Sequence, residues 1–63
     1  MSDFLIHHII VDGVTHHARK AGANFWTLIR LPLGKRFVYE GDCWEVISVW
    51  NSRLNRVVAV KLM

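Results

Sequence analysis

Turn-forming residues divide this chain into short segments, and this division limits the possible folds more than any other feature. Asp12-Gly13 lies between β-branched residues, a pattern typical of a two-residue β-hairpin turn. Further breaks fall at residues 21–24, 32–34 and 40–41, each of which contains glycine. The segments between these breaks are rich in valine, isoleucine and aromatic residues, so they favour short strands.

These breaks predict an all-β chain without a convincing helix. The expected strands cover residues 3–11, 14–20, 25–31, 36–39, 42–50 and 57–63, with a polar loop over 51–56. Five or six short strands at this spacing predict a small barrel or a curled antiparallel sheet. Residues 37–49 resemble a strand pair of a small SH3-like or OB-like barrel, an architecture that carries many unrelated functions.

A helix over residues 15–29 is the competing prediction, and it would make the fold α+β. Thr15 is a suitable N-cap, and four apolar residues would share one helical face: Ala18, Ala21, Phe25 and Leu28. Gly22 and Asn24 would both destabilise the middle of such a helix relative to alanine. The all-β fold is therefore the preferred interpretation.

The chain has more apolar residues than a domain of its size can bury. Its 63 residues are predicted to form one small domain over 1–63, yet 52% of them are hydrophobic and three are tryptophan. A domain this short buries only about 60% of the surface that its unfolded chain exposes. Because large exposed apolar patches mark interaction sites, we expect a protein partner, a homo-oligomer or both.

The cysteine content indicates a reducing compartment. Cys43 is the only cysteine, so no disulfide forms within the chain. With no signal-peptide pattern, this predicts a cytoplasmic protein. The apolar stretch over residues 4–11 is too short to cross a membrane, so no membrane partner is expected.

All four histidines flank the Asp12-Gly13 turn. A two-residue turn sets His8 opposite His17 on one face, with their Cβ atoms about 5 Å apart. His7 and His16 form a diagonal pair on the other face. Histidines divided between two faces cannot all bind one ion, so neither a metal nor another cofactor is predicted. We expect one pair to face solvent.

The last two predicted strands have two different faces if their loop is even, for instance residues 52–55. Trp50 then lies opposite Val57, and the same face carries Trp44, Val46, Ser48, Ala59 and Lys61. This mixed face is predicted to bind a partner, because tryptophan is enriched in binding hot spots. The other face is aliphatic and predicted to be core; it contains Cys43, Ile47, Val49, Val58, Val60 and Leu62.

Basic residues concentrate near the turns, in a chain of net charge +3. The candidates for binding are Arg30, Lys35, Arg36, Arg53 and Arg56. Arg19 and Lys20 end the second predicted strand. If these turns gather at one rim of the barrel, the side chains form a positive collar that contacts phosphates. The acids Glu40, Asp42 and Glu45 cluster in a different hairpin.

The sequence contains no persuasive catalytic set. Cys43 and a histidine would need an orienting group, and Cys43 falls on the predicted core face. No glycine-rich phosphate loop is present, and a chain this short has little room for a substrate pocket. The protein is therefore predicted not to be an enzyme.

Two classes of function remain. The preferred prediction is a small non-enzymatic protein-binding module that docks through its apolar tryptophan face. It would be an adaptor or inhibitor-type accessory protein of the kind that phages and plasmids encode. The alternative is a nucleic-acid-binding barrel that uses basic loops and exposed aromatic residues, with strongly salt-dependent binding. Excess apolar surface is a stronger feature here than net charge, which favours the first.

Overall fold

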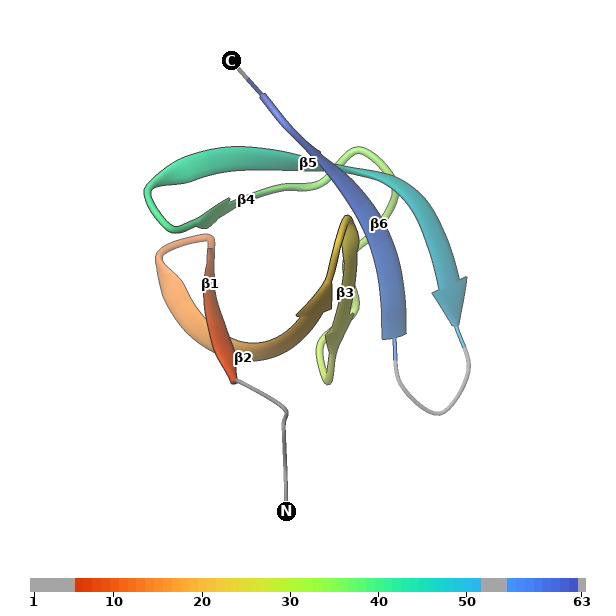
Figure 1. The fold of residues 1–63 in the computed structure, drawn as a ribbon, viewed down its shortest axis with the longest axis horizontal. Helices are drawn as coiled ribbons and strands as arrows, with labels where there is room; N and C mark the ends of the chain where they lie inside the picture. Colours follow the sequence, from red (N-terminus) through yellow and green to blue (C-terminus); the bar gives the residue numbers. More distant parts are fainter. Residues whose placement is uncertain (1–5, 52–54, 63) are drawn as a thin grey trace.

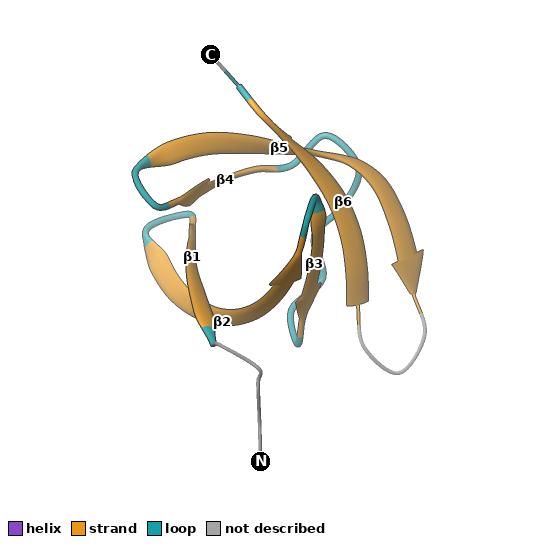
Figure 2. Cartoon of the chain, viewed as in Figure 1, coloured by secondary structure: helices purple, strands orange, loops and turns teal. Residues whose placement is uncertain are grey.

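The computed structural model describes residues 6–51 and 55–62, which form a closed antiparallel barrel. Its strands are β1 (His7–Val11), β2 (Val14–Ala21), β3 (Asn24–Thr27), β4 (Arg36–Tyr39), β5 (Asp42–Asn51) and β6 (Asn55–Lys61). They are joined side by side in the order β1-β2-β3-β6-β5-β4 (Figure 1). The prediction of an all-β fold and a small SH3-like or OB-like barrel is confirmed. None of the described residues forms a helix, so this part of the chain has no helix able to cross a membrane (Figure 2).

Two of the predicted turns have the backbone geometry that their sequences indicate. Asp12 and Gly13 have φ values of 51° and 81°, and Glu40 and Gly41 have values of 51° and 80°. Successive residues in the left-handed region form a turn whose twist matches that of the flanking strands. The predicted pairing of β1 and β2 is confirmed, with Val11 opposite Val14.

The alternative prediction of a helix over residues 15–29 is wrong. The segment forms the β2-β3 hairpin instead, with Lys20 opposite Phe25. Gly22 has a φ of 60° and turns the chain where the helix would have continued. Ala18 and Phe25 are both buried because they point inward from adjacent strands, which alternation along a strand explains as well as helical spacing does.

β3 ends at Thr27, earlier than the predicted strand over 25–31. The Thr27 hydroxyl donates a hydrogen bond of 2.6 Å to the Ile29 carbonyl, and the Asn55 amide donates one of 3.1 Å to the same oxygen. These bonds accompany the bend of the chain away from the sheet. Leu31 then packs into the core from the loop. The predicted first strand begins at residue 3, but residues 3–5 lie outside the described residues.

The predicted register of the last hairpin is wrong. Asn51 pairs with Asn55, which leaves residues 52–54 as an odd-numbered connection, and Trp50 therefore lies opposite Arg56 instead of Val57. A bulge between Val46 and Ser48 shifts the register once more. A shift by one residue moves side chains to the other face of a strand.

The face of β5 and β6 that was predicted to be core is mostly the outer face: Val46 and Ala59 share a face, as predicted, but this face points inward. Cys43, Ile47 and Val60 were predicted to be core, but all three are exposed. Val49, Val58 and Leu62 from the same predicted face are half-buried. The buried residues of these strands come from the face that was predicted to bind a partner: Val46, Val57 and Ala59.

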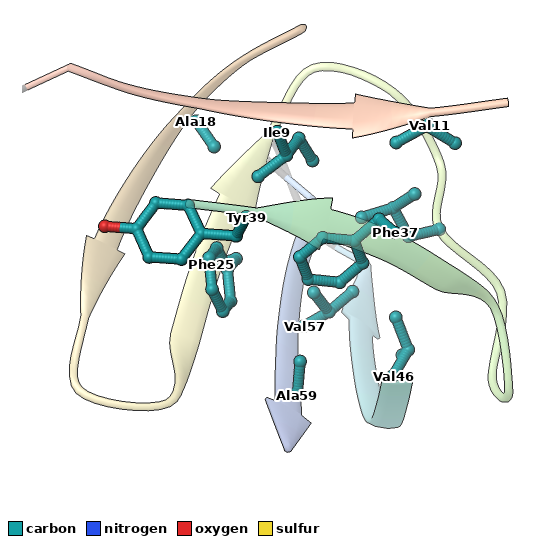
Figure 3. Close-up of a cluster of buried hydrophobic side chains, with 10 residues drawn as sticks. Ile9, Val11, Ala18, Phe25, Phe37, Tyr39, Val46, Val57 and Ala59 are labelled. Atoms are coloured by element: carbon teal, nitrogen blue, oxygen red, sulfur yellow. The ribbon is translucent and has the colours of Figure 1, made fainter. Parts of the chain in front are cut away.

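The core lies between the strands and centres on aromatic rings (Figure 3). Phe25 is fully buried, and its ring forms edge-to-face contacts with Phe37, Tyr39 and Trp44 at centroid distances of 5.1, 5.5 and 5.4 Å. Such contacts add stability beyond the area that they bury. Aliphatic side chains from both halves of the chain fill the remaining interior: Ile9, Val11, Ala18, Leu31, Val46, Val57 and Ala59.

The exposed thiol gives a direct test of the β5 face assignment. Cys43 lies opposite Val38 on the outer surface of the barrel. We expect a thiol-specific reagent to label Cys43 fully in the folded protein, because an exposed thiol is accessible to attack. Mass spectrometry before and after addition of denaturant checks this. If labelling begins only on unfolding, Cys43 is buried in the core and this assignment of the β5 faces is wrong.

Candidate docking face

Four large side chains form a row across the outer surface of β2, β3, β6 and β5. Arg19 pairs with Trp26, Trp26 with Arg56, and Arg56 with Trp50. Directly paired residues on one face of a sheet lie about 5 Å apart. The row therefore alternates arginine and tryptophan across adjacent strands, and we refer to these four residues as the Arg–Trp row.

The end of this row is held by a stacking contact. The Arg56 guanidinium carbon lies 4.4 Å from the centroid of the Trp50 ring, a close cation–π distance. Trp50 is 47% exposed, whereas Trp26 and Arg56 are half-buried. Arg56 Nε is buried and has no hydrogen-bond partner among the described residues. The contact orders a long cation and a large aromatic ring before any partner binds.

Two shallow hollows adjoin the row. The first, of about 210 Å³, is lined by Ile6, His17, Ala18, Arg19, Trp26, Thr27 and Leu28. The second, of about 240 Å³, is lined by Thr15, His16, His17, Leu28 and Ile29. His17 and Leu28 line both hollows, and Leu28 is 86% exposed. The row thus borders a partly apolar depression, which we call the Leu28 groove.

The predicted excess of apolar surface is present on the described residues. Besides Trp50 and Leu28, the exposed large apolar side chains are Ile6, Ile10, Val14, Leu33, Val38, Ile47 and Val60. Ile10 and Val38 are paired on β1 and β4, away from the Arg–Trp row. The outer surface therefore offers apolar contacts on more than one side of the barrel.

Three of the six predicted basic binding residues lie within salt-bridge distance of an acid. Lys35 Nζ lies 2.8 Å from Asp12 Oδ1, and Arg36 Nε lies 3.5 Å from Glu45 Oε1. Lys61 Nζ and Asp42 Oδ2 are 3.9 Å apart. Of the other candidates, Arg56 joins the Arg–Trp row, Arg30 is exposed in the loop after β3, and Arg53 lies outside the described residues. The acids expected to lie apart from the cations include partners of Arg36 and Lys61.

The structure does not place Trp44 and Trp50 on one face, as the sequence had predicted. Trp44 points inward and packs on the core, and Trp50 points outward. Six positions separate them, so regular alternation would have set both on one side. The bulge between Val46 and Ser48 adds one residue and reverses the alternation. Lys61 lies opposite Trp44, away from the Arg–Trp row.

Sequence reasoning did not select Trp26, Leu28 or Arg19 as a binding set. A signal was present for two of them. Alternation in a strand whose Phe25 faces the core turns Trp26 outward. A two-residue turn at residues 22–23 then sets Arg19 opposite Trp26, as observed. Leu28 lies beyond the end of β3, where strand periodicity gives no indication of its direction.

The histidine pairs are arranged as the hairpin predicts. His8 and His17 lie opposite each other on the exposed face, with ring centroids 4.8 Å apart. His7 and His16 are half-buried on the inner face. The Tyr39 hydroxyl oxygen and Nδ1 of His7 are 2.7 Å apart and hydrogen bonded. Within residues 6–51 and 55–62, no three histidine, cysteine or acidic side chains gather as metal ligands.

Comparisons with protein-family models, curated proteins and solved structures give no match to this chain.

Proposed function

We propose that this chain is a non-enzymatic protein-binding module that docks through the Arg–Trp row and the Leu28 groove. The stacking of Arg56 on the exposed Trp50 ring carries the proposal. Tryptophan and arginine are enriched in the residues that supply most of the binding energy at protein interfaces. A pre-ordered pair of this kind also loses less conformational freedom on binding.

The row and the groove together indicate the chemistry of the partner. Arg19 and Arg56 alternate with the indoles, and the Arg56 guanidinium complements a carboxylate, because guanidinium groups bind carboxylates with paired hydrogen bonds. The partly apolar groove beside Trp26 suits a large apolar side chain. The proposed partner is therefore a protein segment in which an acidic residue lies near an aromatic or aliphatic anchor.

A protein partner is favoured over nucleic acid by the state of the other cations. Tight nucleic-acid binding draws on many lysines and arginines that neutralise phosphates. Here Lys35, Arg36 and Lys61 each lie within salt-bridge distance of a carboxylate. Exposed Trp50 supports base stacking as the second candidate function, so single-stranded nucleic acid is included in the test.

The expected homo-oligomer and the accessory role of an adaptor or inhibitor stay predictions, as does the cytoplasmic location. The exposed pair of Ile10 and Val38 supports self-association, because it lies on strands that do not contribute to the Arg–Trp row. Accessory proteins of phages and plasmids are the class that we favour for such a compact binding module.

Selection from a random displayed peptide library tests the proposal without knowledge of the natural partner. We expect enriched peptides to combine aspartate or glutamate with tryptophan, phenylalanine or leucine, and to compete for one site. A (dT)10 oligonucleotide titrated at low and high salt is the second arm. Enrichment without acidic residues, or salt-sensitive (dT)10 binding that displaces the peptides, would contradict a protein-docking role.

A further inference from the structure

Lys20 extends from β2 to a cluster of aromatic rings inside one end of the barrel. Its Nζ lies 5.6 Å from the Phe25 ring centroid, 5.5 Å from that of Tyr39 and 5.5 Å from that of Trp44. The rings come from β3, β4 and β5, so side chains from three different strands converge on one cation. These distances are within the range of cation–π attraction.

The three rings are held in place independently of Lys20. Phe25 and Tyr39, Phe25 and Trp44, and Tyr39 and Trp44 all make edge-to-face contacts, at 5.5, 5.4 and 5.9 Å. Phe25 is fully buried and Tyr39 nearly so. Burial, and secondly the Glu40 carboxylate, raise the pKa of the Tyr39 phenol above its ordinary value, so the phenol stays neutral near pH 7.

The Lys20 ammonium group forms no salt bridge among the described residues, although the Glu40 carboxylate interacts with the Tyr39 phenol. By contrast, Lys35 and Lys61 each lie within salt-bridge distance of a carboxylate. Two polar groups lie near the rings: His7 is hydrogen bonded to Tyr39, and the buried Trp44 indole nitrogen has no hydrogen-bond partner among residues 6–51 and 55–62. The surroundings of the Lys20 ammonium are therefore mainly aromatic.

We propose that Phe25, Tyr39 and Trp44 form a binding site for alkylammonium groups, and that Lys20 occupies this site in the unbound protein. The ammonium group of Lys20 occupies the position that the cationic group of a ligand would take. Aromatic clusters of this kind recognise quaternary ammonium groups. An external group takes the site when the flexible Lys20 side chain withdraws towards solvent. This site is separate from the Arg–Trp row and does not depend on the docking proposal.

Quaternary and methylated amines are the expected class of ligand. Their positive charge is retained, while their methyl groups replace the hydration shell of a primary ammonium and fit an apolar surface. Lys20 is half-buried, so its head group can leave without exposing the whole core. The site would then accept a methylated lysine or a choline-like group.

Choline and its uncharged analogue 3,3-dimethyl-1-butanol test this site, because they have similar shapes and differ in charge. The variants are wild type, Lys20→Ala and, as a matched control, Lys61→Ala, which removes a lysine opposite Trp44 that does not lie over the rings. The readout is the Trp44 indole N–H signal by NMR, assigned with Trp44→Phe. In Lys20→Ala we expect saturable choline binding about tenfold tighter than in wild type.

The results with these variants and probes distinguish a cation-binding site from a purely apolar cavity. The proposal requires that Lys61→Ala binds choline as weakly as wild type, and that the neutral analogue binds Lys20→Ala at least several-fold more weakly than choline. Equal binding of the two probes would reveal an apolar hole without cation recognition. A folded Lys20→Ala variant whose Trp44 signal does not respond to choline would overturn the site.

A measurement on the wild-type chain covers the case in which Lys20→Ala does not fold. Ring currents from three aromatic rings must shift the Lys20 ε-methylene protons upfield. We expect choline to return these signals towards their ordinary positions while the Trp44 indole signal moves. If the Lys20 signals stay upfield while choline shifts the Trp44 signal, choline does not displace the Lys20 side chain and the proposal is wrong.

Discussion

Replacement of Phe25 by alanine is expected to unfold most of the protein at 25 °C. Phe25 is fully buried, and its ring contacts Phe37, Tyr39 and Trp44. Loss of a buried phenylalanine side chain costs about 3–5 kcal/mol. A core of this size supplies a free energy of unfolding of only about 3–5 kcal/mol. Urea denaturation followed by circular dichroism measures the loss.

Val60→Ala is the matched control for this prediction. Val60 is on the outer face of β6 and 45% exposed, so we expect its loss to change the free energy of unfolding by less than about 1 kcal/mol. A Phe25→Ala variant that unfolds cooperatively at the wild-type urea concentration would mean that the aromatic cluster is not the centre of the core.

Trp50→Ala is expected to weaken binding of the selected acidic peptides by at least about 2 kcal/mol, or about 30-fold. The substitution removes an exposed indole and also the surface on which the Arg56 guanidinium is ordered. Arg56→Gln keeps a polar side chain at the same position but removes the charge. We therefore expect it to weaken binding of the acidic peptides more than binding of peptides in which the acidic residue is replaced by its neutral amide. Isothermal titration calorimetry gives the affinities.

Val38→Ala provides the control for binding. Val38 is exposed on β4, outside the Arg–Trp row, so its loss should leave peptide affinity within about twofold of wild type. Circular dichroism of Trp50→Ala first establishes that the barrel is intact. If Trp50→Ala and Val38→Ala bind the peptides with equal affinity, the Arg–Trp row is not part of the binding site.

Local sequence patterns predicted the turns because turn formation depends on adjacent residues. Asp12-Gly13 and Glu40-Gly41 adopt positive φ values, and each turn contains a glycine, the residue that tolerates such values best. The register of β1 and β2 followed from the first turn, and with it the facing pair of His8 and His17. The number and close spacing of the short strands then indicated a small barrel without any knowledge of distant contacts.

The binding face was harder to predict because it depends on one inserted residue. Nothing in the sequence of β5 marks the bulge between Val46 and Ser48, yet it turns Trp44 inward and Trp50 outward. The number of residues in the β5-β6 connection is equally ambiguous from sequence. The pairing of Arg19 with Trp26 and Arg56 with Trp50 further requires that β6 joins β3, a contact between segments far apart in the chain.

The three indole N–H signals test the docking face most directly, because each tryptophan occupies a different environment. Trp26 and Trp50 belong to the Arg–Trp row, whereas Trp44 lies inside one end of the barrel. On titration with a selected acidic peptide, we predict that the Trp26 and Trp50 signals shift together and saturate, while the Trp44 signal stays in place. Saturable binding that shifts Trp44 and leaves Trp26 and Trp50 unchanged would contradict the account.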